Sequence, residues 1–161
     1  MPPCLHVAED QARFRTALAA ADVTILGREG HERHPAQGRA RLVLTSSVEA
    51  VAFDADDDKI ARWNPVGATL ADALAAFGEG NERKRTAVIA GGTRVMTELL
   101  PVTDRFDLVV APDCRIVGGR ACLVGTRSVP EIEDRLRSAG LARTRVASLG
   151  PARLMIWNRS P

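Results

Sequence analysis

Short apolar runs rich in β-branched residues alternate along the chain with segments whose apolar residues recur every three or four positions. The first pattern is typical of buried strands, and the second of helices with one apolar face. The clearest strands are predicted at 22–26, 41–44, 87–90 and 106–110, and the clearest helices at 8–20, 69–77, 93–100 and 130–140. Strands that alternate with helices predict an α/β domain with a largely parallel sheet.

The remaining segments are shorter or less periodic. Two strands at 141–149 and 153–158 surround Gly150-Pro151 and predict a hairpin, which adds an antiparallel edge. Short strands are also predicted at 50–53 and 60–63. The stretches 54–58, 78–85 and 113–128 are predicted as an acidic loop, a polar connection and a glycine-rich loop.

The helix at 8–20 is predicted to be amphipathic, because Phe14, Ala17 and Leu18 share one face, whereas Arg13 and Arg15 point elsewhere. Trp63 and Trp157 are expected in the core. Thr69 directly precedes the helix predicted through Phe77, and Asp72 lies in the first turn of that helix. This spacing predicts that Thr69 caps the helix N-terminus.

Length and composition agree with one globular domain covering residues 1–161, because 45% hydrophobic and 26% charged residues are ordinary values. The net charge of +2 is too small to indicate nucleic acid binding. No apolar run is long enough to span a membrane, and no signal peptide is recognisable, so a cytoplasmic location is expected. Three cysteines without CxxC spacing predict reduced thiols rather than disulfides or a zinc site.

The stretch TAVIAGGTRVMTELL, residues 86–100, holds the strongest local signal. A buried strand ends at Gly91-Gly92, and a helix follows that Thr93 can cap. Two glycines let a ligand approach the backbone, and a helix N-terminus with Arg94 beside it suits a phosphate. A tight turn without a ligand is an equally good interpretation of the two glycines alone.

Two other predicted strands end in similar residues. One ends at Gly27-Arg28, and the next leads into Thr45-Ser46-Ser47. Ligands of open α/β sheets bind at the carboxyl ends of parallel strands. These three strand ends together predict a pocket of backbone N–H groups, hydroxyls and guanidinium charge, which favours phosphate. The GxGxxG dinucleotide motif is absent.

The order and spacing of these pieces resemble the dihydrofolate reductase superfamily, including the reductase domain of riboflavin biosynthesis. The resemblance extends from about residue 1 to residue 158. It is carried by four segments: DQARF at 10–14, VTILGR at 23–28, GRARLVLTS at 38–46 and IAGGTRV at 89–95.

The resemblance implies a three-layer α/β/α fold and an NADPH-dependent reductase that acts on a pterin- or pyrimidine-like small molecule. It places Arg28, Thr45, Ser46 and Arg94 at the phosphates of NADPH, with Gly91-Gly92 packed against the cofactor and joined by a cis bond. It also assigns a substrate carboxylate to Arg39 and the heterocyclic ring to Asp10. With Gly27, Ser47 and Thr93 added from the strand-end motifs, this is the full set of predicted site residues. No metal site is predicted.

Three departures from the family pattern limit what the resemblance implies. The family has a strand and a loop before its first helix, whereas this chain begins at that helix. Gly30 and Val109 stand where the family often has threonines, the second of which helps to hold the pterin, so folate is not expected as the substrate. Without the first strand, we expect either association with another chain, as in a homodimer, or lower stability than that of an extended chain.

Two further motifs are weighed against metal binding, and one alternative for the whole chain stays open. His31 to His34 lack the HExxH spacing of a metal site, and the acidic stretch 54–58 lacks the spacing of a calcium loop, so both are interpreted as solvated surface. For the whole chain, the alternative to a reductase is a non-catalytic dinucleotide-binding or assembly protein.

Overall fold

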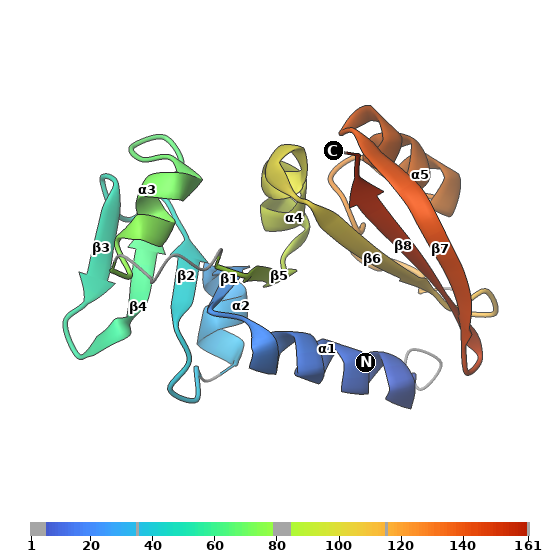
Figure 1. The fold of residues 1–161 in the computed structure, drawn as a ribbon, viewed down its shortest axis with the longest axis horizontal. Helices are drawn as coiled ribbons and strands as arrows, with labels where there is room; N and C mark the ends of the chain where they lie inside the picture. The colour runs from blue at the N-terminus through green and yellow to red at the C-terminus, as the bar shows by residue number, and fades with distance from the viewer. Residues whose placement is uncertain (1–5, 35, 79–84, 115, 161) are drawn as a thin grey trace. The chain divides into compact units, whose positions relative to one another are not determined.

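The structure, a computed structural model, describes residues 6–34, 36–78, 85–114 and 116–160. The chain forms two compact units (Figure 1). The first, here called the parallel unit, consists of residues 17–95. The second, here called the antiparallel unit, contains the residues up to Thr16 and those from Met96 onward. Each unit is described by itself.

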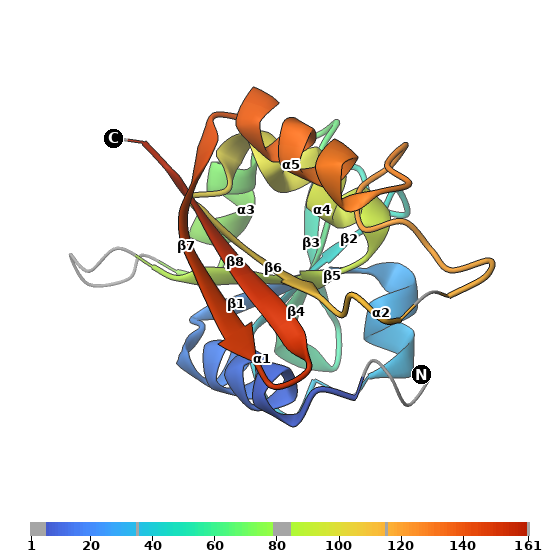
Figure 2. The same cartoon turned by 90° about the vertical axis from the view of Figure 1, so that its right-hand side faces the viewer.

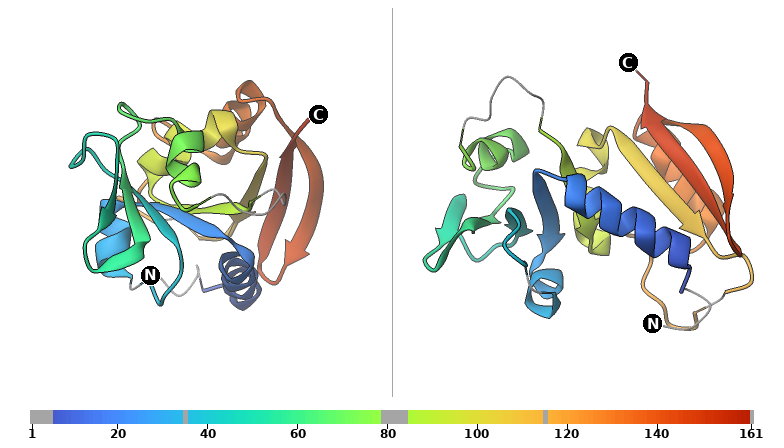
Figure 3. Two further views of the ribbon diagram at one scale, coloured as in Figure 1. Left: turned by 60° about the vertical axis from the view of Figure 1, so that its left-hand side comes forward. Right: turned by 60° about the horizontal axis from the view of Figure 1, so that its bottom comes forward.

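The parallel unit is built on a five-stranded sheet with the order β3-β4-β2-β1-β5. Strands β4, β2, β1 and β5 run parallel, and β3 pairs antiparallel with β4 (Figure 3). The elements that begin in this unit are β1 (Val23–Gly27), α2 (Arg28–Arg33), β2 (Arg41–Leu44), β3 (Val51–Asp54), β4 (Asp57–Trp63), α3 (Leu70–Ala75), β5 (Ala87–Gly91) and α4 (Thr93–Leu99).

The central strands of this sheet are apolar because they are covered on both faces and paired on both sides. Leu42 is fully buried in β2, and Ile25 is 1% exposed in β1. Trp63 at the end of β4 is also buried, as predicted, and its indole Nε1 donates to the carbonyl of Ala68 at 2.9 Å.

Helix α3 begins as its sequence predicts. The hydroxyl of Thr69 accepts from the backbone N–H of Asp72, and the Asp72 carboxylate accepts from the backbone N–H of Thr69. This reciprocal pair satisfies two of the N–H groups that every helix start leaves unpaired.

The antiparallel unit contains a three-stranded sheet with the order β6-β8-β7. Helix α5 packs against β7 (Figure 2). It carries Ile132 and Leu136 into a core that also includes Leu123 and Trp157. Trp157 is 1% exposed, as predicted for a core residue. The elements that begin in this unit are α1 (Ala8–Ala20), a 3-10 turn (Leu100–Val102), β6 (Arg105–Val110), α5 (Val129–Ser138), β7 (Leu141–Leu149) and β8 (Ala152–Arg159).

Most predicted elements are confirmed within two or three residues, but three details differ. The predicted hairpin pairs with β6 in a sheet of its own rather than forming an edge of the parallel sheet. Residues 57 and 58, predicted as part of an acidic loop, belong to β4 (Asp57–Trp63). The predicted polar connection lies largely at 79–84, outside the described residues.

Helix α1 forms over the predicted residues 8–20. None of its side chains is buried, and Phe14 is 44% exposed.

Two chemical expectations are also corrected. No peptide bond of the described residues is cis, so the expected cis bond between Gly91 and Gly92 is absent. Cys114 is disulfide-bonded, which contradicts the expected reduced state, whereas Cys122 is a free thiol. Burial raises the pKa of the Cys122 thiol, so this group is a poor nucleophile.

Candidate functional site

The carboxyl ends of three parallel strands meet at one edge of the five-stranded sheet. Gly27 of β1 is in register with Leu44 of β2, and Leu26 of β1 is in register with Gly91 of β5. This register brings together three groups of predicted site residues: Gly27 with Arg28, Thr45 to Ser47, and Gly91 to Arg94. We call this set the carboxyl edge.

Two glycines let the backbones approach closely at this edge. A Cβ atom added to Gly92 would lie 3.4 Å from Cγ2 of Val95 and 4.0 Å from the backbone nitrogen of Gly27. A Cβ added to Gly27 would lie 3.3 Å from the same Cγ2. Val95 is 3% exposed, so a Cβ at Gly27 would require this packed side chain to shift slightly, whereas a Cβ at Gly92 would only make ordinary contact with it.

Gly91 has a different role. Its φ is +131° and that of Gly92 is +91°, conformations that residues with a side chain rarely adopt. A Cβ built on Gly91 would meet no atom within 4 Å. The backbone is thus bare on this side of the turn, and an external group can approach it. A flat or phosphate-bearing cofactor fits this observation, because no side chain obstructs its path to the peptide groups.

The segment after β2 presents hydroxyl groups in a fixed turn. The backbone N–H of Ser47 donates to Oγ1 of Thr45 at 3.2 Å, and the two side-chain oxygens are 3.1 Å apart. The backbone N–H of Thr45 donates to the carbonyl of Trp63 at 2.9 Å, which anchors the start of the turn to β4. Ser46 and Ser47 are exposed, so their hydroxyls are accessible to a ligand.

Two arginines supply positive charge at the carboxyl edge. Arg28 is the first residue of α2 and is 69% exposed, and its ion pair with Glu32 is long, at 3.8 Å. Arg94 follows Thr93 at the start of α4 and is exposed. Because its ion pair with Glu32 is long and exposed, the guanidinium of Arg28 can turn toward a phosphate at little cost.

A buried arginine that the sequence did not single out holds α2 in place. Arg41 of β2 is 7% exposed; its Nη1 donates to the carbonyl of His34 at 2.6 Å and lies 3.2 Å from Nδ1 of His31. Burial and then the nearby charge of Arg39 lower the pKa of Arg41. The helix that carries Arg28 is therefore tied to β2 at its far end. In the sequence, Arg41 stands between Ala40 and a run of apolar residues, and this position gave no sign that Arg41 holds the helix.

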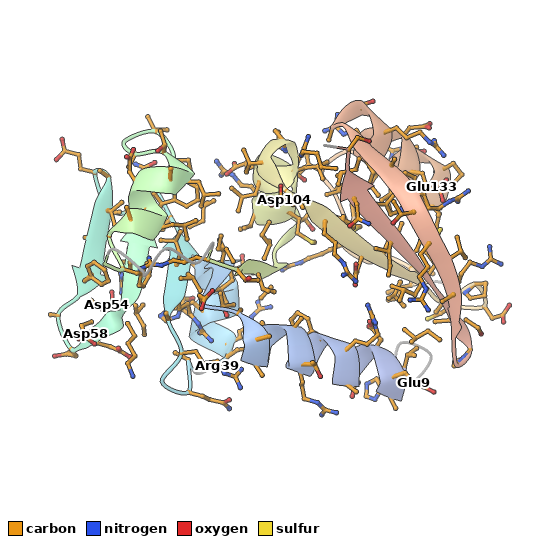
Figure 4. The ribbon with its side chains drawn as sticks, in the orientation of Figure 1. Glu9, Arg39, Asp54, Asp58, Asp104 and Glu133 are labelled. Atoms are coloured by element: carbon orange, nitrogen blue, oxygen red, sulfur yellow. The ribbon has the colours of Figure 1, made fainter. Side chains whose placement is uncertain are left out.

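Arg39, the predicted substrate residue, does not lie at the carboxyl edge. It occupies the turn before β2, at the amino end of that strand, and is labelled in Figure 4. The same end of the sheet has a cavity of about 680 Å³, which none of the predicted site residues lines. Its lining comes from the amino ends of β1, β2 and β4, from β3, and from the residues that follow α3 and precede β5. It includes Asp22, Ala40, Phe53, Lys59, Phe77 and Arg85.

Two of the charged residues that line this cavity, Arg85 and Asp22, have local partners. Arg85 donates to the carbonyls of Leu74 and Gly78, and the Asp22 carboxylate accepts from the backbone N–H of Thr86 at 2.7 Å. Phe53 and Phe77 pack edge to face with ring centres 5.3 Å apart. These contacts have a structural role, because they hold the cavity walls in place. The carboxyl edge is the better candidate for a phosphate site.

The antiparallel unit contains Asp10, the predicted catalytic acid. It lies in the first turn of α1 and is partly buried. Burial raises its pKa, the charge of Arg13 lowers it, and the charge of Asp107 raises it again, so that the pKa is above the usual value for an aspartate. Such a carboxyl holds its proton at higher pH than an ordinary aspartate does.

Asp107 of β6 is a neighbour that the sequence analysis missed. Its carboxylate accepts from Arg13 at 2.7 Å and from two nitrogens of Arg105 at 2.7 and 3.0 Å. Burial alone would raise its pKa, but the two arginines lower the pKa below the usual value. Two carboxyls with opposite pKa shifts therefore interact in this unit. A charged residue within an apolar strand was the only signal for Asp107 in the sequence.

The described residues contain neither a cluster of metal ligands nor a helix suited to a membrane. In the described ranges, no group of three histidine, cysteine, aspartate or glutamate residues could hold a metal ion. None of the helices in these ranges has the length and apolar content that crossing a bilayer requires.

Comparison with known proteins finds similarity at the level of the fold. No family model and no curated protein matches the chain. A dihydrofolate reductase from Enterococcus faecalis, solved with NADP(H) and RAB-propyl, matches with a TM-score of 0.57 and 18% identity over 97% of this chain and 84% of that one. RibD from Acinetobacter baumannii matches with a TM-score of 0.55 and 12% identity over all of this chain and 54% of that one. The chain thus has a dihydrofolate reductase-like α/β fold, as its sequence predicted.

Proposed function

We propose that this protein is an NADPH-dependent reductase that transfers a hydride to a pterin- or pyrimidine-like heterocycle. The observation that carries the proposal is the carboxyl edge, where three strand ends bring together two close-packed glycines, a bare peptide turn, a hydroxyl-bearing turn and two arginines. Similarity in fold to a dihydrofolate reductase that was solved with NADP(H) supports the choice of cofactor.

Each group at the carboxyl edge has a task in this proposal. Arg28 and Arg94 neutralise phosphate charge, and Thr45, Ser46 and Ser47 donate hydroxyl hydrogen bonds to phosphate oxygens. Gly91 and Gly92 admit the cofactor to the backbone, Gly27 makes room for that turn, and Thr93 begins the helix behind it. When bound, the dinucleotide supplies the hydride, and the protein supplies orientation and a proton.

Asp10 is the proposed proton-holding group. Its raised pKa favours the protonated form that can donate a hydrogen bond to a ring nitrogen or carbonyl. Arg39 is proposed to bind an anionic group of the substrate. Because Arg39 lies at the amino end of β2, away from the carboxyl edge, this is the assignment that the structure supports least.

Calorimetric titration with NADPH and NADH tests the cofactor. We expect tighter binding of NADPH, because the additional phosphate needs positive charge and hydroxyls. Arg94→Ala and Arg28→Ala should each weaken NADPH binding by about 1–3 kcal/mol, and NADH binding by less. Arg33→Ala is the matched control, since Arg33 is exposed on the same helix as Arg28 and pairs with Glu29 in the same way. Equal affinity for both cofactors, or equal effects of all three variants, would contradict the proposal.

The substrate is tested by following NADPH oxidation with a set of reducible pterins and pyrimidines. Dihydrofolate is expected to be a poor substrate, because Val109 of β6 cannot offer a hydroxyl to a buried polar group of the ring. Rapid turnover of dihydrofolate would show that another residue provides this contact.

A non-catalytic dinucleotide-binding or assembly protein is the second candidate. It is favoured by one observation: α1, the helix that carries Asp10, has no buried side chain to fix its position. Tight NADPH binding without oxidation of the cofactor by any tested heterocycle would select this alternative.

A further inference from the structure

The attachment of helix α1 is the feature of the antiparallel unit that the proposed function leaves unexplained. This helix carries Asp10, yet none of its side chains is buried, so core packing does not hold it. Val7, directly before the helix, is 4% exposed and anchors its start. Further along the helix, Arg13 donates to the carboxylate of Asp107 in β6 at 2.7 Å. Asp10 lies midway in sequence between Val7 and Arg13, so both contacts bear on its position.

Asp107 is held in one orientation for its contact with α1. Its carboxylate also accepts from Nε and Nη2 of Arg105, at 2.7 and 3.0 Å. Two parallel N–H bonds from one guanidinium fix the plane of a carboxylate. In the described part of the chain, the bond from Arg13 is the one hydrogen bond that joins a side chain of α1 to another element. Asp107 therefore determines where this part of α1 lies on β6.

Two features of Asp107 suit it to hold a neighbour rather than to transfer a proton. The two arginines lower its pKa, so the carboxylate stays ionised and has no proton to donate. Asp107 and Val109 are separated by one residue of β6, so they face the same side of the strand. This is the side that contacts α1, and the proposed function places the substrate ring at Val109.

We propose that Asp107 is a positioning residue for Asp10: its ion pair with Arg13 holds the first half of α1 against β6 and so places the Asp10 carboxyl beside the substrate. Asp10 and Arg13 are three residues apart and are neighbours on the helix surface, so a displacement at Arg13 also moves Asp10. The proposal rests on the proposed function for the role of Asp10, whereas the link between α1 and β6 depends on no activity.

Hydrogen exchange of the full chain tests the link without requiring activity. Asp107→Asn keeps the shape of the side chain but removes its charge, and Arg13→Gln removes the charge of the other partner. Each should make the amides of residues 11–16 exchange roughly threefold faster, as expected for the loss of a partly exposed ion pair. Arg13→Lys should restore part of the protection. Asp54→Asn is the matched control, because Asp54 accepts from two nitrogens of Arg62 in the parallel unit (Figure 4), and it should leave α1 unchanged.

The titration of Asp10 tests the effect on the carboxyl itself. Burial is the main cause of its raised pKa, the charge of Arg13 opposes burial, and the charge of Asp107 adds to it. Loss of Asp107 removes one raising charge and exposes Asp10 to water. Asp107→Asn should therefore move to lower pH both the carboxyl NMR titration of Asp10 and the alkaline limb of NADPH oxidation. Asp54→Asn should move neither.

Two results would overturn the proposal. If neither Asp107→Asn nor Arg13→Gln accelerates exchange in α1, the ion pair holds nothing in place. If α1 exchanges faster but the titration of Asp10 does not move, the link holds the helix without positioning the carboxyl. Failure of the unaltered chain to oxidise NADPH with any heterocycle would instead contradict the proposed function, and the exchange and NMR measurements would still decide whether Asp107 positions Asp10.

Discussion

Helices α5 and α1 differ in how many of their side chains are buried, and their sequences do not reveal this difference. Both were predicted as helices, and both form within two residues of the predicted bounds. Yet α5 buries Ile132 and Leu136, whereas α1 buries nothing and leaves Phe14 44% exposed. Spacing identifies which face of a helix needs cover, but the presence of cover depends on which strands lie beneath it.

Strands β2 and β5 teach the same lesson. Both are short apolar runs in a parallel sheet, but β2 has neighbours on both sides and three buried residues out of four, whereas β5 has one neighbour and none. The difference between complete and incomplete packing can be measured, and three predictions follow in order of decreasing effect.

The largest effect is expected for Leu136→Ala in α5. Leu136 is fully buried, so its truncation should lower the free energy of unfolding by about 2–5 kcal/mol. Phe14→Ala in α1 should cost less than about 1 kcal/mol, because much of the ring is already in water. Urea denaturation measures both. Similar losses for the two variants would mean that the apolar face of α1 is covered in solution.

A smaller effect is expected at the start of α5. The hydroxyl of Ser128 accepts from the backbone N–H of Glu131 at 3.4 Å, and the Glu131 carboxylate accepts from the N–H of Arg127 at 2.7 Å. Ser128→Ala should therefore cost about 1 kcal/mol in the same denaturation experiment. Ser138→Ala, in an exposed position at the end of the same helix, should change stability by less than about 0.5 kcal/mol. A change as large at Ser138 would show that the effect has nothing to do with capping.

The smallest effects are expected for Asp107 of β6 and Asp10 of α1, whose pKa values shift in opposite directions. The pKa of Asp107 is lowered in the folded state, so its contribution to stability is present above the unfolded pKa and is lost as pH falls through the folded pKa. Asp107→Asn should remove this contribution, about 1 kcal/mol or less for so exposed an ion pair, and flatten the acid side of the stability profile.

Asp10 should behave in the opposite way. Its pKa is raised in the folded state, so its contribution is present below the unfolded pKa and is lost as pH rises through the folded pKa. Asp10→Asn should then be slightly more stable than the unaltered chain at neutral pH. Unfolding in urea at several pH values from acid to neutral distinguishes the variants, and a stability change of the same sign in both would contradict the assigned pKa shifts.

Local sequence rules predicted the elements well because each depends on neighbours in the chain. The cap formed by Thr69 and Asp72 and the turn at Gly91-Gly92 both follow from short patterns. The parallel register that joins Gly27, Thr45 and Gly91 at one edge followed from the alternation of strands and helices. The grouping of these predicted cofactor residues is therefore largely readable from sequence.

The features that sequence did not predict depend on distant contacts. Arg41 looked like the first residue of a strand, but it holds α2 through His34. Asp107 looked like a surface charge, but two arginines from different elements bind it. The division into two sheets was missed because the pairing of β6 with β8, rather than with a parallel strand, has no local signal. In each case the partner lies several residues or a whole element away.

Hydrogen exchange of the full chain with and without NADPH tests the central claim, that the carboxyl edge of the parallel unit binds the cofactor. The account predicts that NADPH slows exchange at residues 27–28, 45–47 and 91–94, and leaves the cavity lined by Phe53, Lys59 and Phe77 unchanged. Protection confined to that cavity, or no protection anywhere at saturating NADPH, would contradict it.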